Sequence, residues 1–186
     1  HFENGVPVGC ESNLLHETLG KYLERQDGQL PVPQILYLAH QIALALAAAH
    51  EKHIVHRDLK PDNVMLVGDA NFPGQLRVKL LDFGIAKVGR ENQLPGDGAV
   101  KTQVGSFLGS PLYMSPEQCR GAETVGPPSD VYSVGVMLYL MLSGEPPFVG
   151  SSVGVIVGMH MYQAAPQLLN KAPKTMPQLA SLVDSM

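Results

Sequence analysis

The side chains best suited to chemistry lie in residues 56 to 63, which read HRDLKPDN. Asp58 offers a carboxylate that can accept a proton, and Asn63 offers an amide oxygen that can bind a hard cation. Phosphoryl transfer needs both, because a carboxylate orients the attacking hydroxyl and oxygen ligands hold magnesium on the phosphates. A loop lets side chains five residues apart point into one cleft, whereas a regular helix or strand turns them in different directions. By residue type, Asp58 therefore suits the first task and Asn63 the second.

A second carboxylate, Asp82, begins the tripeptide DFG. It directly follows residues 76 to 81, which have the composition of a β-strand. Carboxylate oxygen suits Mg²⁺, so Asp82 is a candidate second metal ligand. The tripeptide alone says little, and it gains weight only from its place after the loop at 56 to 63 and after a strand.

These two segments resemble the catalytic loop and the D-F-G signature of serine/threonine protein kinases. Residues 56 to 63 meet every fixed position of the family pattern H-R-D-L-x-x-x-N, and Lys60 is the serine/threonine-kinase form. The resemblance implies ATP and Mg²⁺ as cofactors and proteins as substrates. It assigns catalysis to Asp58 and Lys60, and binding of the magnesium nucleotide to Lys60, Asn63, Met65 and Asp82. Lys60 would contact the transferred phosphate and Met65 the adenine, although plain packing explains a methionine at position 65 equally well.

Residues 109 to 117, GSPLYMSPE, are similar to the family segment that closes the activation loop and receives the substrate peptide. Ser115 stands where the A-P-E form has alanine, and the form MSPEQ is typical of bacterial, Hanks-type kinases. The resemblance implies that Ser110 contacts Asp58 and Lys60 and so binds the substrate. It gives Glu117 a structural role, in which it pairs with an arginine from a later helix that this sequence does not reach.

Residues 129 to 135, SDVYSVG, open an apolar helix. An aspartate at a helix N-terminus is favoured electrostatically and can accept backbone N–H groups. The resemblance implies that Asp130 braces the catalytic loop. It also gives structural roles to His56, Phe83 and Gly84, with Phe83 packed against His56.

The long segment from residue 84 to residue 104 lacks periodicity and holds Gly89, Pro95, Gly96 and Gly98, as functional loops often do. By resemblance it is the start of the activation loop. Thr102 and Ser106 are then candidate phosphorylation sites, and Arg57 is a cation able to meet a phosphate there. We expect these three residues to be regulatory.

Two long apolar helices, which we expect to be buried, are predicted to frame this site at residues 35 to 49 and 131 to 142. A shorter helix is predicted at 18 to 26, and short β-type runs at 54 to 55, 64 to 67 and 76 to 81, the last two forming a hairpin. The predicted fold is mainly α with a small β-hairpin (α+β), which matches the C-terminal lobe of a protein kinase. We expect residues 1 to 16 to be irregular and residues 17 to 186 to be a partial kinase domain that is truncated at its C-terminus.

The composition narrows the possible partners. A net charge of −4 and a pI near 5.9 argue against nucleic acid and anionic membranes, which favour a basic face. Two cysteines, Cys10 and Cys119, fit a reducing cytosol, so we expect a cytoplasmic protein. The charge-free run at 131 to 144 is shorter than the ~20 residues that span a bilayer, so no membrane segment is expected here, although the parent protein could carry an anchor elsewhere.

Several readings stay open. The histidines at 50, 53 and 56 lack the H-E-x-x-H spacing of a zinc helix. No G-x-G-x-x-G and no V-A-I-K-like strand precedes the catalytic loop, so we expect the N-terminal kinase lobe to be missing from this chain and to act as its partner. Three functions therefore stay open. They are an active serine/threonine kinase, a catalytically inactive, truncated binding protein and a small-molecule phosphotransferase.

Overall fold

The computed structural model describes residues 2–3, 6–7, 16–26, 28, 30–68, 75–83, 111–121 and 125–186. Four of the candidate site residues lie outside this part: Gly84, Thr102, Ser106 and Ser110. The helices are α1 (Leu19–Arg25), α2 (Val32–His50), α3 (Pro116–Cys119), α4 (Pro127–Ser143), α5 (Val153–Tyr162), α6 (Leu168–Lys171) and α7 (Pro177–Asp184). The strands are β1 (Phe2–Glu3), β2 (Val6–Pro7), β3 (His16–Thr18), β4 (Val64–Gly68) and β5 (Leu76–Leu80), and two 3₁₀ turns are η1 (Pro61–Asn63) and η3 (Pro111–Tyr113).

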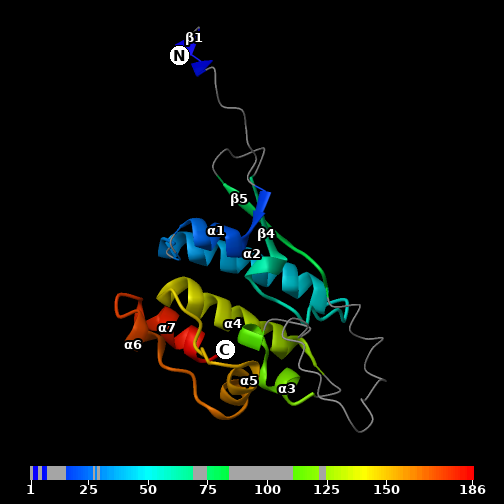
Figure 1. Cartoon of the computed structure of the whole chain (residues 1–186). Helices are drawn as coiled ribbons and strands as arrows, with labels where there is room; N and C mark the ends of the chain where they lie inside the picture. The colour runs from blue at the N-terminus through cyan, green and yellow to red at the C-terminus, as the bar shows by residue number, and fades with distance from the viewer. Residues whose placement is uncertain are drawn as a thin grey trace.

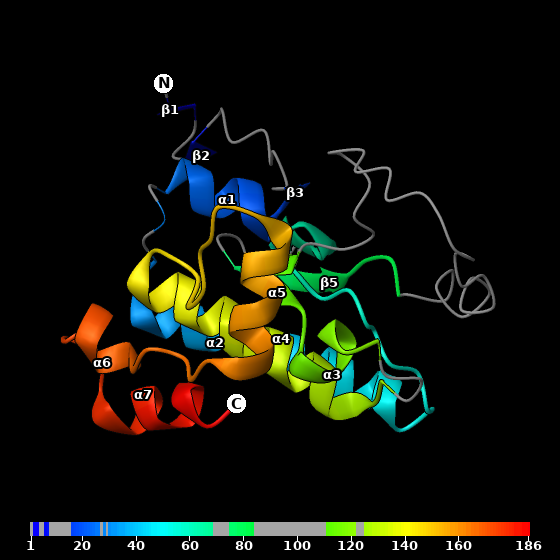
Figure 2. The same cartoon turned by 60° about the horizontal axis from the view of Figure 1, so that its bottom comes forward.

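The predicted class, mainly α with a small antiparallel sheet, is confirmed. Figure 1 shows α1 and α2 on one side of α4, with α5, α6 and α7 on the other. Turning the molecule brings α5 in front of α4 (Figure 2). The largest buried cluster joins residues of α1, α2, β4, α4, α6 and α7, so α4 is the central helix.

Helix α4 confirms the prediction of a buried apolar helix. Most of its residues are buried, and it ends at Gly144, whose φ of +85° is a left-handed conformation that glycine adopts without strain. Asp130 lies in its first turn. The sequence therefore places one carboxylate at the start of the most deeply buried helix.

Helix α2 confirms the helix predicted at 35 to 49, but its burial was predicted wrongly. Only one stripe is buried, namely Ile35, Leu38, Ile42 and Leu46, whereas Leu44 and its neighbours on the outer face are exposed. Only one stripe is buried because α2 packs against α4 and β5 with that side of the helix.

By length and apolar composition alone, α2 is also the only helix in the described part of the chain that could cross a bilayer. At 19 residues it is longer than the run at 131 to 144 that the sequence analysis considered. Its buried stripe nevertheless belongs to the same hydrophobic cluster as α4, as expected of a core helix.

The predicted hairpin is present as β4 and β5, with Val64 opposite Leu80 and Met65 opposite Lys79. A third strand, β3, pairs antiparallel with β4 and was not predicted, because its three residues are too few to show alternation. Residues 54 to 55 form no strand, contrary to the prediction. The N–H of Ile54 instead bonds to the Ala49 carbonyl at 3.0 Å, after His53 has turned the backbone at a φ of +59°.

Candidate active site

The loop of residues 56 to 63, called the 56–63 loop below, is held by the buried carboxylate of Asp130. One oxygen accepts the backbone N–H of His56 at 2.9 Å and lies 2.7 Å from Nε2 of His50. The other accepts the N–H of Arg57 at 2.9 Å. A carboxylate that is only 1% exposed needs such partners, because burying a charge without hydrogen bonds is strongly unfavourable. Helix α4 thus fixes the backbone at the start of the 56–63 loop.

Asp58 and Asn63 lie together at the two ends of a tight turn. The side-chain amide of Asn63 donates to the backbone carbonyl of Asp58 at 2.7 Å and to its carboxylate at 3.3 Å. The turn η1 makes this possible, because Pro61 starts it and the N–H of Asn63 bonds back to the Lys60 carbonyl at 2.9 Å. Since Nδ2 is the atom turned to Asp58, the Oδ1 of Asn63 points away from that contact.

Asp82 joins this pair through the residue before it. The N–H of Leu81 donates to the Asn63 carbonyl at 2.9 Å, and the Leu81 carbonyl lies 2.8 Å from Nε2 of His56. Asp82 itself is exposed and has a left-handed φ of +51°, which aspartate tolerates better than most residues. Phe83 follows, with its ring centroid 4.8 Å from that of His56. The three oxygen-bearing residues therefore come from two segments that are directly bonded to each other.

The other predicted nucleotide contacts lie beside this junction. Lys60 is half-buried and directly precedes η1. Met65 is half-buried on β4, where the buried Val64 and Leu66 on either side of it point to the core. Because side chains alternate along a strand, Met65 lies on the sheet face opposite the core.

The donor set fits a magnesium nucleotide better than a resident metal ion. Among the residues that the structure describes, no three histidine, cysteine, aspartate or glutamate side chains gather into a metal site. Mg²⁺ keeps several waters and typically takes one or two protein oxygens together with substrate phosphates. The amide oxygen of Asn63 and the carboxylate of Asp82 are donors of that kind.

The segment from η3 through α3, called the 111–119 segment below, lies against the 56–63 loop. Ser115 caps α3, accepting the N–H of Gln118 at 3.4 Å, while Oε1 of Gln118 accepts the N–H of Ser115 at 3.0 Å. The remaining polar atom of this glutamine, Nε2, donates to the backbone carbonyl of Arg57 at 2.6 Å. No role for Gln118 was predicted from the sequence.

Glu117 has a partner within the described residues, while the arginine that the family resemblance implies stays a prediction. Its carboxylate accepts a hydrogen bond from the hydroxyl of Ser129, at the start of α4. Burial alone would raise the pKa of Glu117, but hydrogen bonds from Ser129, its own backbone and Ser115 outweigh burial and lower the pKa. The carboxylate therefore stays ionised and links α3 to α4.

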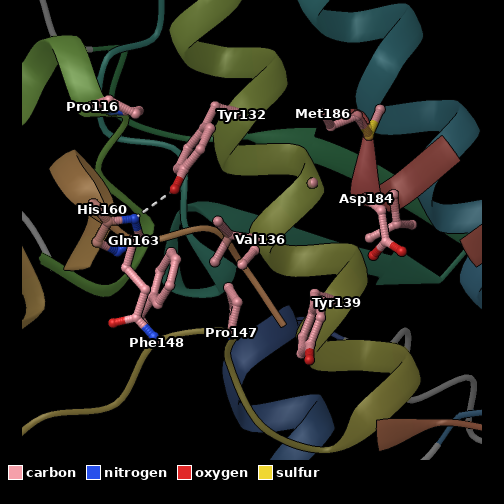
Figure 3. A pocket seen from close by; sticks show the side chains of 13 residues that line it. Pro116, Tyr132, Val136, Tyr139, Pro147, Phe148, His160, Gln163, Asp184 and Met186 are labelled. Atoms are coloured by element: carbon pink, nitrogen blue, oxygen red, sulfur yellow. Dashed lines mark hydrogen bonds between the residues drawn. The ribbon is translucent and has the colours of Figure 1, made fainter. Parts of the chain in front are cut away.

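A cavity of about 260 Å³ lies between α4, α5 and α7, and Asp58 is not among the residues that line it (Figure 3). On its wall the hydroxyl of Tyr132 lies 2.7 Å from Nδ1 of His160, and the ring of Phe148 meets the imidazole edge-on at 4.9 Å. Burial lowers the pKa of His160, and the backbones of Leu112 and Pro111 offset only part of this effect. The histidine is thus a buried, neutral contact beside the 111–119 segment.

Comparison with known proteins adds independent evidence. Residues 10–186 match the protein kinase domain. Serine/threonine-protein kinase pkn2 of Myxococcus xanthus is 41% identical over 156 residues, which cover 84% of this chain and 18% of that protein. Serine/threonine-protein kinase pkn3 of the same organism is 36% identical over 159 residues, covering 86% of this chain and 27% of that protein. Serine/threonine-protein kinase PknB of Mycobacterium leprae is 38% identical over 135 residues, covering 73% and 20%. The chain therefore spans between 18% and 27% of the length of these relatives.

Proposed function

The chain belongs to the protein kinase family, and we propose that the protein which contains it transfers the γ-phosphate of ATP to serine or threonine hydroxyls of proteins. The observation that carries this proposal is the contact between Asn63 and Asp58, together with the backbone bond that ties Asn63 to the residue before Asp82. These contacts support the proposal, because they join the two segments that carry a proton acceptor and two oxygen donors for a cation.

Each of these residues has a distinct task in the proposed reaction. The carboxylate of Asp58 orients the attacking hydroxyl and receives its proton, while the amide of Asn63 holds that carboxylate. Asn63 and Asp82 would hold Mg²⁺, which when bound neutralises the negative charge that develops on the phosphates. Lys60, by family resemblance, would contact the transferred phosphate. Thr102 and Ser106 stay predictions as regulatory sites, and so does a cytoplasmic location.

The test is phosphate transfer from radiolabelled ATP to a protein or peptide substrate by the complete gene product. We expect Asp58→Ala to lower the rate by about 10²–10⁴-fold, the range that a positioned proton acceptor contributes. Asp62→Ala is the matched control, because this aspartate lies in the same loop, is exposed and approaches Gly20 of α1. The control should keep the wild-type rate.

Three outcomes would count against the proposal. Wild-type rate in Asp58→Ala would remove the assigned role, and equal losses in both variants would show a general disturbance of the loop. A folded wild-type protein that binds its partners but transfers no phosphate would favour the binding-protein alternative.

A further inference from the structure

The backbone at Arg57, directly before Asp58, has an unusual conformation. Arg57 has a φ of +66°, in the left-handed region that side chains other than glycine rarely adopt. The peptide that follows it is planar, so its carbonyl oxygen and the N–H of Asp58 turn together. The orientation of this plane decides where the chain carries the carboxylate of Asp58.

Gln118 is the side chain that holds the carbonyl of this peptide. Its Nε2 donates to the Arg57 oxygen at 2.6 Å, across 61 positions of sequence. On the opposite side of the same peptide, the N–H of Asp58 contacts Nδ1 of His56 at 3.4 Å. The bond from Gln118 is therefore the shorter of the two contacts.

The chemistry of the two partners requires an amide at position 118. The N–H of Ser115 is a donor and needs the Oε1 acceptor, whereas the Arg57 carbonyl is an acceptor and needs the Nε2 donor. A glutamate would satisfy the first partner and fail the second. One side chain thus joins the 111–119 segment to the 56–63 loop, which Figure 2 shows next to each other.

We propose that Gln118 is a positioning residue for phosphoryl transfer, which fixes the Asp58 peptide relative to the 111–119 segment. This inference rests on the proposed function and on the family resemblance, by which residues 109 to 117 receive the substrate peptide whose hydroxyl Asp58 orients. A displacement of about 1 Å between reacting groups can lower a rate by about 10²-fold. A direct bond between the two segments limits such a displacement.

The competing explanation is that Gln118 only completes the cap of α3. Gln118→Glu separates the two roles, because Ser-x-x-Glu is an equally good capping box but places a carboxylate oxygen against the Arg57 carbonyl. Ser115→Ala is the matched control, because it breaks the box and leaves Nε2 of Gln118 free to reach Arg57. Alanine is also the family's usual residue at that position.

The experiment measures kcat and KM for ATP in the complete gene product, with thermal denaturation as a check on folding. We expect Gln118→Glu to lower kcat about 10-fold to 100-fold with KM for ATP within about twofold of wild type, while Ser115→Ala keeps kcat. Gln118→Met, which has similar length and no polar atoms at its end, should show the same loss of kcat, and it serves as the second variant if the glutamate variant is unstable.

The outcomes separate this inference from the proposed function. If wild type transfers phosphate and Gln118→Glu keeps its kcat, the positioning role is wrong and the proposed function stands. An equal loss of kcat in Ser115→Ala would show that only the cap of α3 matters. No transfer by folded wild-type protein would overturn the proposed function and this inference with it.

Discussion

His160 shows how a single buried side chain makes stability depend on pH. Its ring packs against Phe148 and forms a hydrogen bond with Tyr132, and the residue is only 4% exposed. Burial lowers its pKa below the ordinary 6.5, so the folded state resists a proton that the unfolded state accepts. By linkage, the stability that the neutral ring provides is present above about pH 6.5 and is lost as the pH falls toward the lower pKa of the folded state.

We therefore expect the melting temperature of wild-type protein to fall between pH 7.5 and pH 5.5 by more than that of His160→Gln, which cannot gain a charge. Thermal denaturation at the two pH values measures the difference. His53→Gln is the control, because that histidine is exposed, and its pH dependence should match wild type. A His160→Gln protein with the full wild-type pH dependence would contradict the assignment.

At the same scale, sequence patterns selected candidate site residues where short segments of the chain carry the pattern. Asp58, Asn63 and Asp82 stand in short, recognisable segments, and the structure joins those segments. Gln118 was not identified, and His50 was considered only as a zinc ligand, because each contacts a partner far along the chain. Gln118 reaches Arg57 over 61 positions and His50 reaches Asp130 over 80, and no local pattern records such distances.

Among the elements, α2 shows why composition alone overstates burial. Alanine and leucine favour a helix wherever they lie, so the apolar run at 35 to 49 predicts the helix well. Which side of it is covered depends on what packs there, and only α4 and β5 do so extensively among the described elements. The sequence pattern therefore could not show which face of α2 is exposed.

Two leucines of α2 test this one-sided packing. Leu38 has no exposed surface, and Leu44 is 57% exposed on the same helix. We expect Leu38→Ala to lower the free energy of unfolding by about 2–5 kcal/mol, through lost burial and the cavity that remains. Leu44→Ala should change it by less than about 0.5 kcal/mol.

Urea denaturation of both variants compares the same chemical change in one helix. Because propensity and side-chain type are identical, any difference reports burial. Similar losses in the two variants would mean that the outer face of α2 is covered in the folded protein.

Across the whole molecule, the site depends on elements distant in sequence. Asp130 at the start of α4 fixes the backbone of His56 and Arg57, and β5 delivers Leu81 to Asn63. The central helix and the small sheet thus hold opposite ends of the same loop. The family resemblance implied the contact of Asp130 with this loop, whereas the bond from Leu81 to Asn63 and the third strand β3 were not predicted.

The same contacts hold both the fold and the site. We therefore expect a ligand that binds at the site to stabilise the whole folded protein. A ligand that binds only the folded state stabilises it by RT ln(1 + [L]/Kd), about 2.7 kcal/mol at 100 times Kd. We expect MgATP to raise the melting temperature of the wild-type gene product, and EDTA to remove the part of this shift that magnesium supplies. Asp82→Asn should lose that same part, because an amide replaces the anionic metal ligand.

Asparagine is the appropriate replacement, because it tolerates the left-handed φ of +51° at position 82 as well as aspartate does. Asp82 is exposed, so without nucleotide the Asp82→Asn variant should have the same melting temperature as wild type. A smaller rise in melting temperature with MgATP then reports weaker binding. The control is ATP with EDTA, which should shift both proteins equally. If Asp82→Asn kept the full magnesium-dependent shift, Asp82 would not be the metal ligand, and the cation would have to be held by other oxygens near Asn63.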